Sequence, residues 1–431
     1  MTKINANIRR LAMVIANTVD LVGVDDIAHG KRVGIMAREC AKLRGYDGVA
    51  QEMLFEAGLL HDIGVSSTRV HTKLVTELDW DGSQAHCERG SMILSQFQPL
   101  SHLAPIVYYH HTHWKDLVAQ GVPHATALHA NLIYLTDRVD MLTAHNKPGS
   151  GNLVHAEEIR ARIARYSGDF FAPEWVEVFM DVSASEAFWL GMNPENIAQQ
   201  LLEVPEGADG IDGILDLKEL HAFALIIGLI VDAKSPFTAE HSLGVARLSK
   251  FLGGLAGLPP VQNDKLEIAG LLHDIGKLQI PDEILEKPSK LDAHELAVMK
   301  SHSYMTWQIL KPIKGIEEIA QWAAFHHESI NGVGYPFRLH GAELSVEARI
   351  IRVADVYQAM AQKRPYRGTT PAPDILTLLR KMVAGGEVDG GIVDLVADNL
   401  EGCHAVALGL APQLRDAIAG SEGIPGSGLN S

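Results

Sequence analysis

Apolar residues recur along most of the chain at the spacing of one helix face. In residues 268–275 they fall at i, i+3, i+4 and i+7, beside a polar His-Asp pair, which is the pattern of an amphipathic helix. Residues 348–362 (ARIIRVADVYQAMAQ) and 214–234 (ILDLKELHAFALIIGLIVDAK) also predict helices. Neither half contains alternating runs bounded by hairpin turns, so we predict an all-α fold built of helical bundles.

The heptapeptide GLLHDIG occurs twice, at residues 58–64 and 270–276. A chain of 431 residues can form two or three domains, and an internal repeat favours two tandem domains of one plan. Pro, Gly and Asp cluster in EVPEGADGIDG, which is typical of a connection between helices, and the last residues are rich in Gly and Ser. We predict an N-terminal domain at 1–205, a linker at 206–215, a second domain at 216–418 and a flexible tail at 419–431.

The repeat extends to the histidines and aspartates around each heptapeptide. The first copy comprises His29, His61, Asp62, His86, His110, His111 and Asp137; the second comprises His241, His273, Asp274, His302, His326, His327 and Asp355. Two intervals are identical in both copies: 32 residues (61 minus 29, 273 minus 241) and 24 residues (110 minus 86, 326 minus 302). A single buried His is usually a hydrogen-bonded core residue, but a set that recurs in order favours metal ligands.

Imidazole nitrogen and carboxylate oxygen suit first-row divalent metals such as iron, manganese, nickel or zinc. Each copy offers more ligands than one tetrahedral ion can use. Asp274 can place one oxygen on each of two ions, and ions about 3.5 to 4 Å apart can hold a hydroxide and clamp a phosphoryl group. The donor set therefore predicts hydrolysis of a phosphoester.

The order His, His-Asp, His, His-His, Asp resembles that of the HD superfamily of metal-dependent phosphohydrolases. In the second copy, HDIGKLQIPDEIL at 273–285 and HHESINGVGYP at 326–336 are similar to the two halves of the HD-GYP signature. This resemblance, over about residues 220–400, implies a bacterial phosphodiesterase that opens cyclic di-GMP or 3'3'-cyclic GMP-AMP to the linear dinucleotide. The alternatives are a non-catalytic HD-type signalling module and an HD phosphohydrolase acting on another nucleotide.

The resemblance also assigns roles to individual residues. One metal would be held by His241, His273, Asp274 and Asp355, and the other by Asp274, His302, His326 and His327. Catalysis would depend on Asp274 and on Lys277, which would contact the scissile phosphate. The substrate would be bound by Lys277, Gly334, Tyr335, Pro336, Arg364 and Arg367. Phe237 replaces an acidic ligand that some members use for a third ion, so two ions are expected, iron or manganese ahead of nickel or zinc.

The first copy keeps every ligand type but departs from the family in other ways. Val65 stands where the second copy has Lys277, and no sequence like RPYR follows Asp137. Three interpretations remain open: a second active site, a metal-holding but inactive domain, and a structural remnant with its histidines satisfied in the core. We favour the second, a regulatory domain with its own metal site at His29, His61, Asp62, His86, His110, His111 and Asp137.

Charge and apolar runs limit the partners. The formal charge of −16 disfavours a nucleic-acid polymer but leaves a small anionic nucleotide possible beside a metal. The apolar run at 223–231 is about half the length of a membrane helix, and no signal peptide is evident after Arg9 and Arg10. Three scattered cysteines indicate a reducing compartment. We expect a cytoplasmic protein, with a homodimer or a regulatory protein partner also compatible with the sequence.

Overall fold

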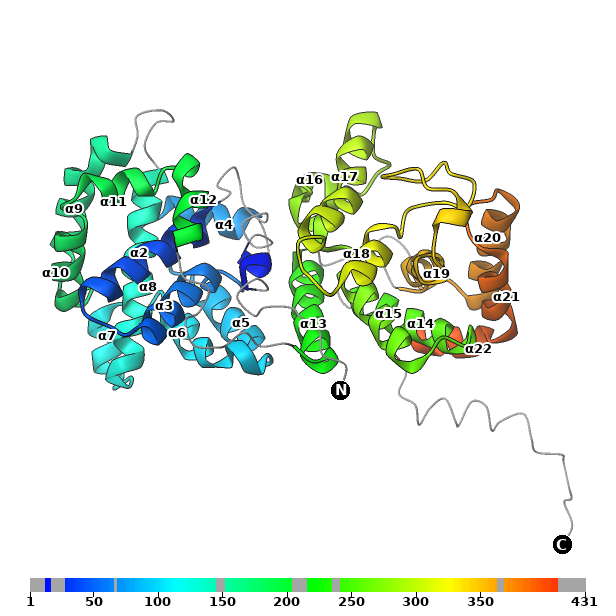
Figure 1. Cartoon of the computed structure of the whole chain (residues 1–431), viewed down its shortest axis with the longest axis horizontal. Coiled ribbons are helices and arrows are strands. Elements are labelled where there is room, and N and C mark those ends of the chain that lie inside the picture. Colours follow the sequence, from blue (N-terminus) through cyan, green and yellow to red (C-terminus); the bar gives the residue numbers. More distant parts are fainter. Residues whose placement is uncertain are drawn as a thin grey trace, which may run out of the picture. The chain divides into compact units, whose positions relative to one another are not determined.

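The computed structural model of the protein describes residues 12–16, 28–65, 68–144, 152–203, 215–234, 241–362 and 368–409. These residues form α-helices and short 3-10 helices, with isolated β-bridges such as Ser167 with Phe171 and no longer strand (Figure 1). The predicted all-α fold is therefore confirmed. No helix within the described ranges has the length and apolar character needed to span a bilayer.

The chain divides into two compact units. The first comprises residues 1–235, 277–285 and 312–316, and the second comprises residues 236–276, 286–311 and 317–431. The predicted linker falls mostly on residues 204–214, and the predicted tail on 410–431, which are both outside the described residues. The predicted domain boundaries therefore stay a prediction.

The first unit contains most of the N-terminal helices. They are α2 (His29–Leu43), α3 (Gly48–Leu60), α4 (Thr68–Thr76), α5 (Gln84–Ser95), η1 (Gln98–Leu103), α6 (Ala104–Tyr109), α7 (Trp114–Ala119), α8 (His124–Ala144), η2 (Asn152–His155), α9 (Ala156–Arg165), α10 (Pro173–Val182), α11 (Glu186–Gly191), α12 (Pro194–Glu203), α13 (Leu217–Lys234), η3 (Ile275–Gln279, of which only the last residues belong to this unit) and α16 (Asp282–Leu285). Helix α13 matches the helix predicted at 214–234.

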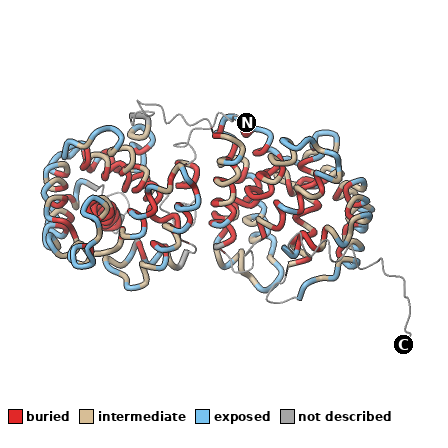
Figure 2. Tube along the Cα trace, turned by 90° about the horizontal axis from the view of Figure 1, so that it is seen from below, coloured by how far each residue is buried: buried red, intermediate tan, exposed pale blue. Residues whose placement is uncertain are grey.

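The second unit contains the remaining helices. They are α14 (His241–Leu255), α15 (Pro260–Leu272), α17 (Ala293–Leu310), α18 (Glu317–Ala324), η4 (Gly341–Glu343), α19 (Val346–Ala361), α20 (Ala372–Ala384), α21 (Gly390–Asp398) and α22 (Leu400–Ala407). Helix α19 matches the helix predicted at 348–362. In both units the buried segments lie toward the inside and the exposed segments lie along the outside (Figure 2).

The glycines of the repeated heptapeptide explain how the ligand-bearing helices come together. A Cβ on Gly58 would lie 2.6 Å from the Cα of Gly34 in α2, and one on Gly270 would lie 2.7 Å from the Cα of Ala246 in α14. A Cβ on Gly64 would lie 2.0 Å from the carbonyl oxygen of His86. Such distances exclude any side chain, so glycine permits the close helix contacts that surround the His-Asp pair.

Candidate metal centres and active site

The predicted ligands of the second unit come from five elements. His241 is the first residue of α14, His273 caps the C-terminal end of α15, and Asp274 follows it. His302 lies within α17 and Asp355 within α19. His326 and His327 occupy the turn after α18. The structure therefore collects the residues of one sequence repeat at a single buried centre.

Asp274 lies between two groups of histidines. Its Oδ2 is 3.2 Å from His273 Nε2, and its Oδ1 is 3.6 Å from His302 Nε2 and 3.7 Å from His326 Nε2. On the Oδ2 side, His241, His273 and Asp355 bring ligand atoms within 4.8 Å of one another. On the other side, His302, His326 and His327 do the same. The two carboxylate oxygens thus face different ligand groups, as a bridging ligand requires.

The hydrogen bonds of His302 and His326 fix which nitrogen faces the centre. Their Nδ1 atoms donate to the carbonyl oxygens of Met299 and Ala323 at 2.6 and 2.7 Å, while their Nε2 atoms lie 3.2 Å apart. Because a carbonyl can only accept, each ring carries its proton on Nδ1 and turns a lone pair toward the other. Neighbouring ligands about 2.1 Å from one ion lie at nearly this separation. The donor set therefore fits a divalent metal.

The protonation states of the centre also suit metal binding. Burial, followed by the nearby His273, lowers the pKa of His326 well below its ordinary value. Burial, with His326 and His302 close by, does the same for His327. Burial acts against ionisation of Asp355, but the hydrogen bond with His241 and the charges of neighbouring histidines hold its pKa well below the usual range. Neutral imidazoles and an ionised carboxylate are the forms that bind metal.

The predicted substrate-binding loop is folded against the same centre. The ring of Tyr335 lies 4.8 Å from that of His327, and the Tyr335-Pro336 peptide bond is cis. A Cβ on Gly334 would lie 2.4 Å from the backbone nitrogen of Ser329, so only glycine fits there. Lys277 is half-exposed in η3, three residues after Asp274. Arg364, Arg367 and Phe237 lie outside the described residues.

Sequence reasoning missed two charged residues beside this loop. Glu328 is buried, and its carboxylate accepts hydrogen bonds from the backbone of Phe337 at 2.7 Å and Leu339 at 3.0 Å. Arg352 lies one helical turn before Asp355, and its guanidinium is hydrogen-bonded to His327. The i, i+3 spacing from Asp355 was a usable signal for Arg352. No comparable signal pointed to Glu328, because its partners are backbone groups of the following loop.

The first unit contains a second centre with nearly the same geometry. His29 Nε2 and His61 Nε2 are 3.2 Å apart, as are His86 Nε2 and His110 Nε2. Asp62 lies between the pairs, with Oδ2 3.5 Å from His61 and Oδ1 3.2 Å from His86. Ligand atoms come together in two groups. One group is His29, His61 and Asp137, and the other is Asp62, His86, His110 and His111. All seven predicted ligands of the first copy therefore converge.

Buried charges around the first centre differ from those of the second. The carboxylate of Asp140 accepts hydrogen bonds from His29 Nδ1 at 2.7 Å and from Arg32 Nε at 2.6 Å. Arg138 donates to Asp137 at 2.7 Å and to the carbonyl oxygens of Leu74, Glu77 and Leu78 at 3.1, 2.8 and 3.1 Å. The matching positions of the second centre are Gln358, Gly244 and Val356. This charged support was not among the predicted features.

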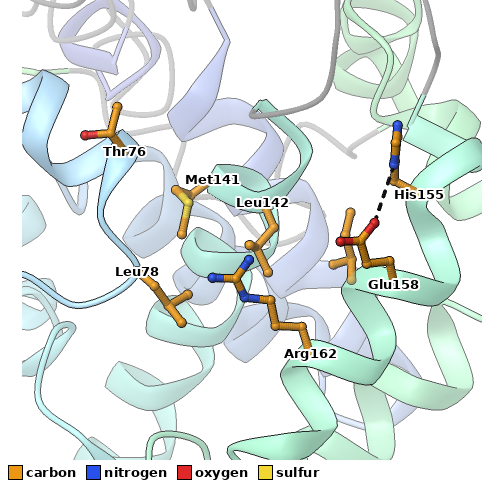
Figure 3. Close-up of a pocket in the computed structure, with 8 residues that line it drawn as sticks. Thr76, Leu78, Met141, Leu142, His155, Glu158 and Arg162 are labelled. Atoms are coloured by element: carbon orange, nitrogen blue, oxygen red, sulfur yellow. Dashed lines mark ion pairs between the residues drawn. The ribbon is translucent and has the colours of Figure 1, made fainter.

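The first unit also contains a cavity of about 240 Å³ away from these ligands (Figure 3). Its walls come from the end of α4, from α8 and from η2 and α9; they are Thr76, Leu78, Met141, Leu142, His155, Glu158, Ile159 and Arg162. His155 and Glu158 form an ion pair across 3.7 Å at one side. None of the predicted metal ligands lines it.

Comparison with protein families identifies the class. A family model for an HD domain matches residues 26–142, and a second HD-domain model matches residues 225–392. The two matched regions coincide with the two ligand centres. The protein is therefore a tandem HD-domain protein, as the repeat predicted.

Comparison with known proteins defines the family. The chain is 34% identical to 3'3'-cGAMP-specific phosphodiesterase 1 of Vibrio cholerae over 411 residues, 95% of each chain. It is 31% identical to 3'3'-cGAMP-specific phosphodiesterase 3 of the same organism. That alignment covers 69% of this chain and 63% of the relative. A cyclic di-GMP phosphodiesterase of Pseudomonas aeruginosa is 33% identical over 39% of this chain and 41% of its own.

A solved structure shows that the similarity extends to the fold. The crystal structure of a cyclic GMP-AMP specific phosphodiesterase of Vibrio cholerae matches with a TM-score of 0.61 and 24% identity, covering 95% of this chain and 99% of that one. The chain belongs to the HD-GYP family of cyclic dinucleotide phosphodiesterases. The family resemblance stated from the sequence is confirmed, and the enzyme class with it.

Proposed function

We propose that this chain hydrolyses 3'3'-cyclic GMP-AMP at the centre of its second unit, giving the linear dinucleotide. The observation that carries this proposal is the complete ligand set and the GYP loop of that unit, with Lys277 three residues after Asp274. The choice of substrate is supported by two relatives, named for 3'3'-cGAMP, that align over 95% and 69% of the chain. The relative named for cyclic di-GMP aligns over 39%, which leaves cyclic di-GMP as the second candidate.

In this proposal the residues of the second unit divide into two ligand sets. His241, His273, Asp274 and Asp355 hold one ion, and Asp274, His302, His326 and His327 hold the other; iron or manganese is the expected metal. Ions held there supply Lewis acidity for hydrolysis of a phosphodiester. Lys277 places a positive charge beside the scissile phosphate. The loop of Gly334, Tyr335 and Pro336 packs against the His327 side, and Arg364 and Arg367 bind the rest of the substrate.

We further propose that the first unit binds metal without hydrolysing the substrate. His86 Nε2 and His110 Nε2 lie 3.2 Å apart, as do His302 Nε2 and His326 Nε2 of the second unit. Val65 is buried where the second copy has Lys277, so the first centre lacks the cation that a phosphate needs. A metal-bearing regulatory domain is therefore favoured over a second active site.

The cytoplasm is the expected compartment and a small anionic dinucleotide the expected partner. Cys40, Cys87 and Cys403 are all buried free thiols, which is typical of a reducing compartment. The net charge of −16 disfavours polymeric nucleic acid. Dimerisation and a protein partner stay predictions.

The test is to incubate the manganese- or iron-loaded chain with equimolar 3'3'-cyclic GMP-AMP and cyclic di-GMP and to separate the products by chromatography. We expect linear GMP-AMP to form first, and no product from the Asp274→Ala variant. Preferential hydrolysis of cyclic di-GMP would overturn the substrate assignment. No turnover of either compound by the metal-loaded chain would overturn the proposed function itself.

A further inference from the structure

The side chain of Arg352 is poorly satisfied for a charged group at a catalytic centre. It is half-buried on α19, and its Nη1 lies 2.9 Å from His327 Nδ1. Its Nε is buried and has no hydrogen-bond partner. Within the described part of the chain, no carboxylate forms an ion pair with Arg352. A guanidinium normally engages several acceptors, so this one has donors to spare.

The guanidinium of Arg352 lies beside a proposed metal ligand. Its contact with His327 places a positive charge at the edge of the group formed by His302, His326 and His327.

The groups beside Arg352 indicate what it can bind. His327, which Arg352 contacts, lies next to Tyr335, with the two ring centroids 4.8 Å apart, and neither ring supplies an anion. A half-buried cation without a counter-charge is unfavourable, and an oxyanion that accepts several donors satisfies it best. The phosphate of a bound dinucleotide is such a group.

We infer that Arg352 is a second substrate-phosphate ligand, placed beside the metal ligand His327. This inference rests on the proposed function. It adds a residue outside the HDIGK and GYP motifs to the substrate site.

The first unit provides a natural contrast. Its residue at the matching position, three before Asp137, is Tyr134, whose buried hydroxyl has no hydrogen-bond partner. The first centre contains two arginines: Arg32 is held by Asp140, and Arg138 by Asp137 and three backbone carbonyls. Both have fixed acceptors and cannot be transferred to a ligand at low cost. Within the described residues, the arginine beside the second centre has no carboxylate partner.

The experiment is calorimetric titration of the manganese-loaded full chain with a non-hydrolysable phosphorothioate of 3'3'-cyclic GMP-AMP. In the manganese-loaded protein, Arg352→Gln should weaken binding by about 10- to 100-fold, the effect of a charge-assisted hydrogen bond. Arg352→Tyr, which copies Tyr134, should behave like Arg352→Gln.

A second titration, with manganese alone, separates substrate binding from support of His327. Arg352→Gln should bind manganese as tightly as the parent, because Arg352 is not among the proposed metal ligands. The matched control is Arg349→Gln on the same helix, because Arg349 pairs with Asp389 at 2.9 Å instead of with a ligand. Its dissociation constants for the analogue and for manganese should both equal those of the parent.

The inference would be overturned if the manganese-loaded parent and the manganese-loaded Arg352→Gln variant bound the analogue with equal affinity. Weaker manganese binding by Arg352→Gln would also overturn it, since that result identifies a support for His327 instead. If the loaded parent hydrolyses neither dinucleotide, the proposed function fails first. If the parent is active but Arg352→Gln binds the analogue normally, the inference alone fails.

Discussion

The two centres share their ligands but differ in the charges that surround them. In the first, Asp140 and Arg32 hold His29, and Arg138 holds Asp137, so buried ion pairs fix the ligands from behind. In the second, Gly244 and Gln358 replace the Arg32-Asp140 pair, and the nearby arginine, Arg352, contacts a histidine. Carboxylates that orient metal-binding histidines strengthen metal binding. The comparison suggests that the first centre is built for retention of metal and the second for exchange of ligands.

The groups proposed to bind the substrate differ between the two centres as well. Beside the second centre are Lys277 and a loop fixed by Glu328, whereas the first centre has Val65 and Thr112 at the matching positions. Retention of metal ligands and loss of phosphate-binding groups are separate changes. A conserved ligand set therefore does not by itself indicate a second active site.

The largest difference between the units is expected from matched changes of the bridging aspartates. Asp274→Asn should reduce turnover of 3'3'-cyclic GMP-AMP by about 1,000-fold or more, because it removes a charge shared by both metal positions. Asp62→Asn should change turnover by about fivefold, the size of a modest coupling between sites. Chromatography of the linear product measures both. Unchanged turnover in Asp62→Asn would argue against regulation by the first unit.

Exchange of the residues after the His-Asp pair tests the phosphate-binding cation. Lys277→Val should lower kcat by about 100-fold with the metal content unchanged, because one electrostatic contact to the transition state is lost. In a chain already inactivated by Asp274→Asn, Val65→Lys should not restore activity, since the first unit still lacks the loop. Steady-state kinetics with elemental analysis checks both variants. Restored hydrolysis would show that the first centre needs only this cation.

The sequence was sufficient for the fold class and for the convergence of the ligands. Helical periodicity and the equal intervals of 32 and 24 residues carried that information. The charged support was not predictable, because Arg138 donates to Glu77 and Leu78, about 60 positions earlier in the chain. Periodicity shows that α8 is buried but does not show which partners satisfy its charges.

A double replacement can make the first centre resemble the second. Arg32→Gly with Asp140→Gln copies Gly244 and Gln358, and the pair must change together because a Cβ at Gly244 would lie 2.2 Å from the Gln358 amide nitrogen. Loss of the carboxylate behind His29 should weaken manganese binding at the first centre by about tenfold. Titration of the full chain with manganese measures this. An unchanged affinity would remove the distinction between retention and exchange.

The smallest expected effect concerns the loop of the second unit. Glu328→Gln keeps one acceptor for the backbone of Phe337 and Leu339 but loses the charge. Charge-assisted hydrogen bonds are about twice as strong as neutral ones, so the KM for 3'3'-cyclic GMP-AMP should rise about threefold with little change in kcat. Thr112→Ala at the matching position of the first unit should change neither constant. A fall in kcat alone would place Glu328 in the chemical step instead.

The most direct test of the account is a metal count on a chain whose second centre is disabled. We predict that His273→Ala with Asp274→Ala, checked for helix content by circular dichroism, retains about two ions per chain at the first centre and hydrolyses neither dinucleotide. Loss of all bound metal would contradict the account by making the first centre a structural remnant. Remaining hydrolysis would contradict it by making the first centre an active site.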